Sequence, residues 1–183
     1  MIIDKTSIPD LLIIQPTIHN DDRGYFFESY KYSDFESNGL PRTFVQHNQS
    51  KSTRGVLRGL HYQLQYGQNK LVWVSQGTVM DVAVDIRKDS PTFGHYESLI
   101  LNDKDHKRFY IPKGFAHGYY VLSEIAIFQY MCTENYHPED EYGISWNDPE
   151  ININWPNGEK LISKKDIKLP CLKDIETKKL PVI

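Results

Sequence analysis

Several features that would define a class of protein are scarce or absent in this chain. It has only two cysteines, Cys132 and Cys171, and they form neither a disulfide framework nor a metal-binding spacing. The first apolar run, at residues 11–14, is too short for the core of a signal peptide, and no run approaches the length of a membrane span. These absences predict a cytoplasmic protein that does not associate with membranes.

Charge of one sign is not in excess. The 183 residues include 21 Lys and Arg against 24 Asp and Glu, and the formal net charge is -3. Such a balance provides no large electrostatic field for binding nucleic acid, which we therefore do not expect as a partner. A glycine-rich phosphate loop is also absent, because Gly55 and Gly59 bracket a strand-like stretch with no helix after it. We expect no nicotinamide cofactor.

What the chain does have is aromatic residues and frequent turns. Twelve Tyr, eight Phe and three Trp, with Gly and Pro at short intervals, are typical of many short strands. Strands are predicted at residues 44–46, 70–75, 78–87, 99–101, 109–111 and 125–132, and Gly77 occupies the turn between the two longest. Short helices are predicted at residues 33–36 and 163–166, which have capping-box spacing. The pattern favours one all-β domain, a sandwich or jelly roll over residues 1–183, with a peripheral C-terminal segment from about 163.

Two carboxylates point to the same side of the strand predicted at residues 78–87. Because strand side chains alternate, Asp81 and Asp85 share one face. That face lies either in solvent or along a wet cavity, and Asp81, deeper in the strand, is the better candidate for a cavity.

The segment from Pro112 to His117 resembles the Pro-x-Gly-x-x-His turn in the second half of cupin domains. Cupins that bind metal usually add a His-x-His pair in the first half, where this chain reads His61-Tyr62-Gln63. His61 and His117 supply fewer ligands than the three or four that a protein metal site ordinarily has. We therefore predict no metal.

Seven segments, in order along most of the chain, resemble the successive motifs of the dTDP-4-dehydrorhamnose 3,5-epimerase family. They lie at residues 22–28, 46–50, 56–63, 81–87, 90–94, 111–118 and 146–149. The resemblance implies a cupin-like jelly roll with a few short helices and no cofactor. It also implies an isomerase that inverts C3 and C5 of a nucleotide-linked 4-keto-6-deoxyhexose, converting dTDP-4-dehydro-6-deoxyglucose to dTDP-4-dehydrorhamnose.

The chemistry explains which catalytic residues are needed. A ketone acidifies the protons on its neighbouring carbons, and inversion needs a base on one face and an acid on the other. The resemblance implies that His61 is the base and Tyr130 the acid. Free imidazole titrates near pH 6.5 and a phenol near pH 10, which suits both roles at neutral pH.

Three further residues complete the catalytic set. Lys70, with Arg58, would stabilise the enolate oxygen. Asp166 matches the aspartate that orients the base, although it also has the spacing to cap a short helix that begins at Ser163, and the sequence leaves both roles open.

The resemblance also implies a set of substrate-binding residues that hold the sugar, the diphosphate or the base. They are Arg23, Phe26, Glu28, Gln46, His47, Asn48, Arg58, His117, Glu141 and Lys165. One departure is His19, which replaces the aromatic residue that relatives often have four positions before Arg23. Imidazole can stack on a base, but the change puts the preference for thymine in question.

Assembly and alternatives follow from the same resemblance. In the family, N-terminal strands cross to the neighbouring subunit of a dimer, so Arg23 and Glu28 would serve the partner's pocket. Alternative hypotheses are an epimerase that acts at C3 or C5 alone, or on another nucleotide's 4-keto sugar, and a non-catalytic sugar-nucleotide-binding cupin. A metal-dependent cupin oxygenase or isomerase is disfavoured by the missing His-x-His pair.

Overall fold

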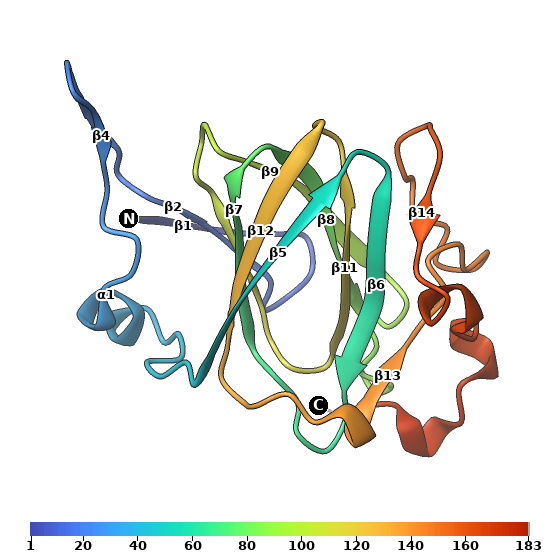
Figure 1. Cartoon of the computed structure of the whole chain (residues 1–183). Coiled ribbons are helices and arrows are strands. Elements are labelled where there is room, and N and C mark those ends of the chain that lie inside the picture. The colour runs from blue at the N-terminus through green and yellow to red at the C-terminus, as the bar shows by residue number, and fades with distance from the viewer. Residues whose placement is uncertain (183) are drawn as a thin grey trace.

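Two antiparallel sheets face each other in the computed structural model, which describes residues 1–182 (Figure 1). The first sheet has the order β1 (Ile2–Lys5), β2 (Leu12–Gln15), β10 (Arg108–Ile111), β7 (Lys70–Gln76), β12 (Ile125–Cys132) and β5 (Gln46–Thr53). The second has the order β13 (Glu141–Gly143), β6 (Val56–Gln63), β11 (Phe115–Val121), β8 (Thr78–Asp85) and β9 (Tyr96–Asn102), with β14 (Leu161–Ile162) parallel to β6.

In the described part of the chain, helix is confined to short pieces. The α-helix α1 (Tyr32–Ser37) covers part of the outer face of the first sheet, where Phe35 packs with Leu71 and Tyr110. Four 3-10 turns lie at Pro138–Asp140, Asp166–Lys168, Leu172–Asp174 and Thr177–Lys179. The predicted all-β, cupin-like architecture is therefore confirmed. Within residues 1–182, no helix is long and apolar enough to cross a membrane.

The main core lies between the two sheets. Val72 and Phe128 from the first sheet pack with Val79, Ala83 and other side chains of the second. The turn predicted at Gly77 joins β7 to β8 with φ of +83°, and a Cβ atom there would lie 2.1 Å from the carbonyl oxygen of Ile125. Glycine is therefore required at this turn by both conformation and space.

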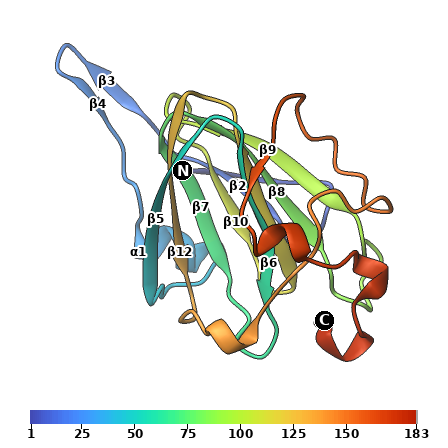
Figure 2. The same cartoon turned by 45° about the vertical axis from the view of Figure 1, so that its right-hand side comes forward.

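An arm leaves the body of the molecule near the N-terminus. It is the hairpin of β3 (His19–Asp21) and β4 (Gly24–Phe26), which projects away from both sheets in the two views (Figures 1 and 2). Its residues are exposed along both strands. At its base, the ring of His106 packs against Tyr25 and Phe27 with centroid distances of 4.6 and 4.7 Å.

Several predicted details differ from the structure. The strand predicted at residues 44–46 instead begins at Gln46 and continues to Thr53. Helix α1 begins one residue before Ser33, so the hydroxyl of Ser33 is inside the helix and makes no cap bond. The segment after residue 163 is not simply peripheral, because Leu172 and Leu180 are buried in the core behind the second sheet.

The two carboxylates predicted to share a face do so, but neither lies in solvent. Asp85 is fully buried and accepts hydrogen bonds from Arg87, Ser90 and Thr92. Asp81 is also fully buried and does not line the cavity described below.

Candidate active site

A cavity of about 620 Å³ opens between the two sheets. Both sheets line it, because β5, β7 and β12 face β6 and β11 across the sandwich. Ten of the residues singled out from the sequence lie in its wall: Gln46, Asn48, Arg58, His61, Lys70, His117, Tyr130, Glu141, Lys165 and Asp166.

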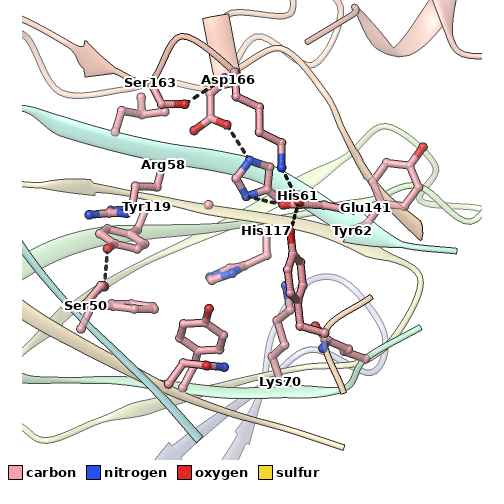
Figure 3. A pocket seen from close by; sticks show the side chains of 18 of the residues that line it. Ser50, Arg58, His61, Tyr62, Lys70, His117, Tyr119, Glu141, Ser163 and Asp166 are labelled. Carbon is pink, nitrogen blue, oxygen red and sulfur yellow. Dashed lines mark hydrogen bonds and ion pairs between the residues drawn. The ribbon is translucent and has the colours of Figure 1, made fainter. Parts of the chain in front are cut away.

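His61, on β6, projects into the cavity between two carboxylates (Figure 3). Its Nε2 lies 2.7 Å from Oδ1 of Asp166, and its Nδ1 lies 3.8 Å from Oε1 of Glu141. The amide of Gly59 also donates to Asp166, at 3.4 Å. Burial alone would raise the pKa of Asp166, but these hydrogen bonds outweigh it and lower the pKa. Asp166 is therefore an ionised acceptor that orients the imidazole.

The sequence left two roles open for Asp166, orienting His61 and capping a short helix, and the residue makes a contact on each side. Its backbone N–H donates to the hydroxyl of Ser163 at 3.0 Å, and this bond ties the start of the 3-10 turn to Ser163. The carboxylate lies against His61, with Oδ1 2.7 Å from Nε2. The turn thus fixes the direction of the Asp166 side chain.

Glu141 has three polar neighbours in the cavity wall, Lys165, Tyr136 and His61 (Figure 3). Its carboxylate accepts hydrogen bonds from Lys165 and from the hydroxyl of Tyr136, the latter at 2.5 Å. Burial opposes ionisation, but these bonds and the nearby His61 lower the pKa of Glu141. Tyr136 lies in a loop and carries no periodic signal, which is why the sequence did not indicate it.

The wall opposite His61 carries the phenol of Tyr130 on β12 and the ammonium of Lys70 on β7. Burial raises the pKa of Tyr130 to about 12, so the phenol keeps its proton throughout the neutral range. Burial lowers the pKa of Lys70, while Cys132, Glu141 and Asp81 favour its charged form. A proton donor and a lysine amine thus face the imidazole from the other sheet.

Two further residues of β5, Gln49 and Ser50, line the predicted wall. Gln46 and Asn48 point to the cavity, and so does Ser50, whose hydroxyl lies 2.8 Å from the hydroxyl of Tyr119. The period of two that relates these three residues was visible in the sequence. Arg58 is held by Ser52, whose Oγ accepts from its Nε at 3.2 Å.

Four predicted substrate-binding residues lie outside this cavity. Arg23, Phe26 and Glu28 belong to the projecting arm and its base, and the side chain of Arg23 is 90% exposed. His47 points to the opposite face of β5, where it packs beside Trp73 and contacts Gln129. Strand alternation is the reason, since His47 lies between Gln46 and Asn48. We therefore leave His47 out of the site.

The described residues, 1–182, contain no group of three or more His, Cys, Asp or Glu side chains arranged to hold a metal ion. His61 and His117 lie opposite each other on neighbouring strands, but each directs one ring nitrogen to its own aspartate.

Fold and site together define a cupin-like β-sandwich with an acid–base cavity between its sheets. The model of the dTDP-4-dehydrorhamnose 3,5-epimerase family matches residues 5–174. The dTDP-4-dehydrorhamnose 3,5-epimerase of Escherichia coli is 49% identical over 98% of this chain and 99% of its own. The chain belongs to this family.

Solved structures agree with this assignment. A dTDP-6-deoxy-D-glucose-3,5-epimerase from Legionella pneumophila, in complex with dTDP-4-keto-L-rhamnose, is 49% identical with a TM-score of 0.96, covering 99% of this chain and 97% of that one. A 3′-monoepimerase from Streptomyces bikiniensis, in complex with dTDP-quinovose, is 32% identical with a TM-score of 0.92, covering 97% and 91%. The same fold is thus found in enzymes named for two positions and for one.

The lowered pKa of Asp166 leads to a stability prediction. Ionised Asp166 stabilises the fold above the carboxyl's unfolded pKa of about 3.9, and this contribution is lost as pH falls through the lower folded value. Asp166→Asn should therefore be less stable than the parent at pH 7, and the gap should narrow below pH 4. Urea unfolding at both pH values measures this; a gap that does not depend on pH would contradict an ionised Asp166.

Proposed function

We propose that this protein is an isomerase that inverts C3 and C5 of dTDP-4-dehydro-6-deoxyglucose to give dTDP-4-dehydrorhamnose. The observation that carries the proposal is the placement of His61 and Tyr130 on opposite walls of one cavity. Support for the substrate comes from relatives of about half-identical sequence, one of them solved with dTDP-4-keto-L-rhamnose bound. Two free cysteines are consistent with a cytoplasmic enzyme.

The mechanism begins with proton abstraction beside the ketone. Asp166 accepts the hydrogen bond of Nε2–H, which leaves Nδ1 of His61 unprotonated and able to take the proton from C3 or C5. Glu141, 3.8 Å from Nδ1, then stabilises the imidazolium. Lys70 and Arg58 supply positive charge for the enolate oxygen, where the electron pair of the broken C–H bond is delocalised.

Reprotonation from the other side completes the inversion. The phenol of Tyr130 returns a proton to the carbon on the face opposite His61, and its raised pKa ensures that it is protonated when the enolate forms. Because both carbons flank the same ketone, one base and one acid serve both positions if the sugar can present each carbon in turn.

The substrate's nucleotide needs ligands for a diphosphate and a base. Gln46, Asn48 and Lys165 line the cavity and supply donors, and His117 lines it as a further substrate-binding residue. We further propose a homodimer in which the arm of each subunit reaches the partner's cavity and there contributes Arg23, Phe26 and Glu28. The exposure of Phe26, at 68%, and of Arg23 supports this, since both belong to the hairpin that projects from the body of the subunit (Figure 1).

A second candidate function is epimerisation at one carbon only. The Streptomyces bikiniensis 3′-monoepimerase shares the fold at 32% identity, so the fold does not separate the two outcomes.

Incubation of the enzyme with dTDP-4-dehydro-6-deoxyglucose in deuterium oxide tests the function directly. We expect deuterium at both C3 and C5, and no uptake with folded His61→Ala, because the base is missing while core volume is kept. NMR of the recovered sugar locates the label. Label at a single carbon would instead support the one-position enzyme, and full exchange by His61→Ala would exclude this base.

Tyr130→Phe should separate exchange from inversion. Without the phenol, His61 can still form the enolate with Lys70 and Arg58, but it can only return the proton to the face that it left. Deuterium uptake should therefore fall less than product formation, with inversion reduced at least tenfold more than exchange. Both are measured in one sample; equal losses would mean that Tyr130 is needed for enolisation itself.

Subunit mixing tests the exchanged arm. Homodimers of His61→Ala and of Arg23→Ala should both lack full activity. A mixed dimer has one complete site, in which the cavity keeps His61 and the partner's arm keeps Arg23. Co-refolding equal amounts should restore about one quarter of parent activity, since half the dimers are mixed and each has one complete site. If the arm serves its own subunit, mixing restores nothing above the average of the two variants.

A further inference from the structure

A second histidine–aspartate pair lies beside the first. Nε2 of His117 lies 2.9 and 3.1 Å from the two carboxylate oxygens of Asp81. Asp81 is completely buried and His117 is 8% exposed. The mechanism above gives His117 only a general binding role and Asp81 none.

The sheet register places His117 in the cavity wall and Asp81 on the next strand beside it. His117 on β11 is opposite His61 on β6, and Tyr119 is opposite Asp81 on β8. Directly opposed residues point to the same face, so Asp81 shares a face with Tyr119 and, by strand alternation, with His117. His117 lines the cavity (Figure 3), whereas Asp81 does not. Within residues 1–182, Nδ1 of His117 makes no hydrogen bond, which leaves this nitrogen for the substrate.

The two aspartates differ in how many donors they receive. Asp166 accepts from His61 and from the backbone amide of Gly59. Asp81 has Nε2 of His117 as its only hydrogen-bond partner in the described chain. Burial works to raise both pKa values, but the bonds to Asp166 leave its pKa lowered, while that of Asp81 stays raised despite His117 and Lys70. A buried carboxylate with a single donor is poorly stabilised in its charged form.

The pair is therefore more stable when it holds one additional proton and is neutral overall. That proton has two arrangements: a carboxylic acid donating to Nε2, or an imidazolium donating to the carboxylate. In both, Nδ1 carries a hydrogen. Lys70 is the nearest alternative source of positive charge, but it makes no ion pair with Asp81 within residues 1–182, and its own charge is opposed by burial. The other titratable groups near Lys70 are Glu141, Cys132 and Tyr130.

We propose that Asp81 is a positioning residue that fixes His117 as a hydrogen-bond donor, with Nδ1–H directed to the ketone oxygen of the substrate. The role in catalysis rests on the proposed function. His61 and His117 then have opposite tasks, although they are neighbours in one sheet. Asp166, which accepts several hydrogen bonds, leaves Nδ1 of His61 with a free lone pair. Asp81, which has one hydrogen-bond partner, leaves Nδ1 of His117 with a proton. His117 transfers no proton; it stabilises the enolate oxygen together with Lys70.

Nitrogen-15 NMR of the histidine rings in the full-length protein tests the arrangement without any substrate. Signals are assigned by their loss in His117→Gln and His61→Gln. At pH 7.5 we expect His117 to be protonated at Nδ1 and His61 to be unprotonated at Nδ1. An unprotonated Nδ1 on His117 would overturn the proposal, because it would mean that Asp81 is ionised and balanced by Lys70. This outcome is independent of which sugar nucleotide the enzyme uses.

Two substitutions of Asp81 then test the consequence for catalysis. An asparagine amide can still donate to Nε2 and keep hydrogen on Nδ1, whereas leucine, of similar size, cannot. We expect Asp81→Leu to lower kcat for deuterium exchange about 100-fold with little change in KM, as for a lost oxyanion donor, and Asp81→Asn to stay within about tenfold of the parent. Equal losses in both variants, or an unchanged kcat in Asp81→Leu, would contradict a donor role for His117.

Failure of the proposal is distinct from failure of the proposed function. If the parent enzyme exchanges no deuterium with dTDP-4-dehydro-6-deoxyglucose, the proposed substrate is wrong, yet the NMR experiment still decides the protonation of His117. If Asp81→Leu does not fold, Asp81→Asn and the parent spectrum still decide it.

Discussion

The packing of the two sheets against each other is the constraint on which the site depends. Facing sheets lie about 10 Å apart, and side chains from both must fill that space. Val72, Phe128, Val79 and their neighbours fill it with apolar groups in one part of the sandwich. Elsewhere the same strands carry polar side chains that do not close the space, and a cavity of about 620 Å³ remains. The core thus holds His61 and Tyr130 on opposite walls.

Within that cavity, burial and donor number decide what each acid or base can do. Tyr130 has a raised pKa because its surroundings desolvate the phenolate, and this favours a proton donor. Burial opposes the ionisation of both aspartates, and in Asp166 the hydrogen bonds outweigh it and lower the pKa. Residue type alone therefore does not set the role, since two histidines on adjacent strands, each paired with an aspartate, have different electrostatic surroundings.

The arm links the site to assembly. Its exposed Tyr25 and Phe26 place apolar rings on a hairpin that has no contact with its own cavity, while His106 holds its base against the body. Aromatic side chains exposed on a projecting hairpin favour contact with another chain. An active site completed by such an arm would tie catalysis to dimer formation, and the specificity for the nucleotide would then depend on residues from both subunits.

The sequence by itself determined the all-β class, the family and the turn at Gly77, because strand alternation, motif order and glycine conformation are local properties of the chain. It also identified His61, Tyr130 and Asp166 by resemblance. It did not determine that Asp81 is bonded to His117, that Asp85 is buried and bonded to Arg87, or that His47 points away from the cavity. Those facts depend on strand register and on which face of each sheet is covered, and residues far apart in the chain set both. Only the tertiary structure decided them, since burial and the number of hydrogen-bond donors are properties of a neighbourhood rather than of a residue.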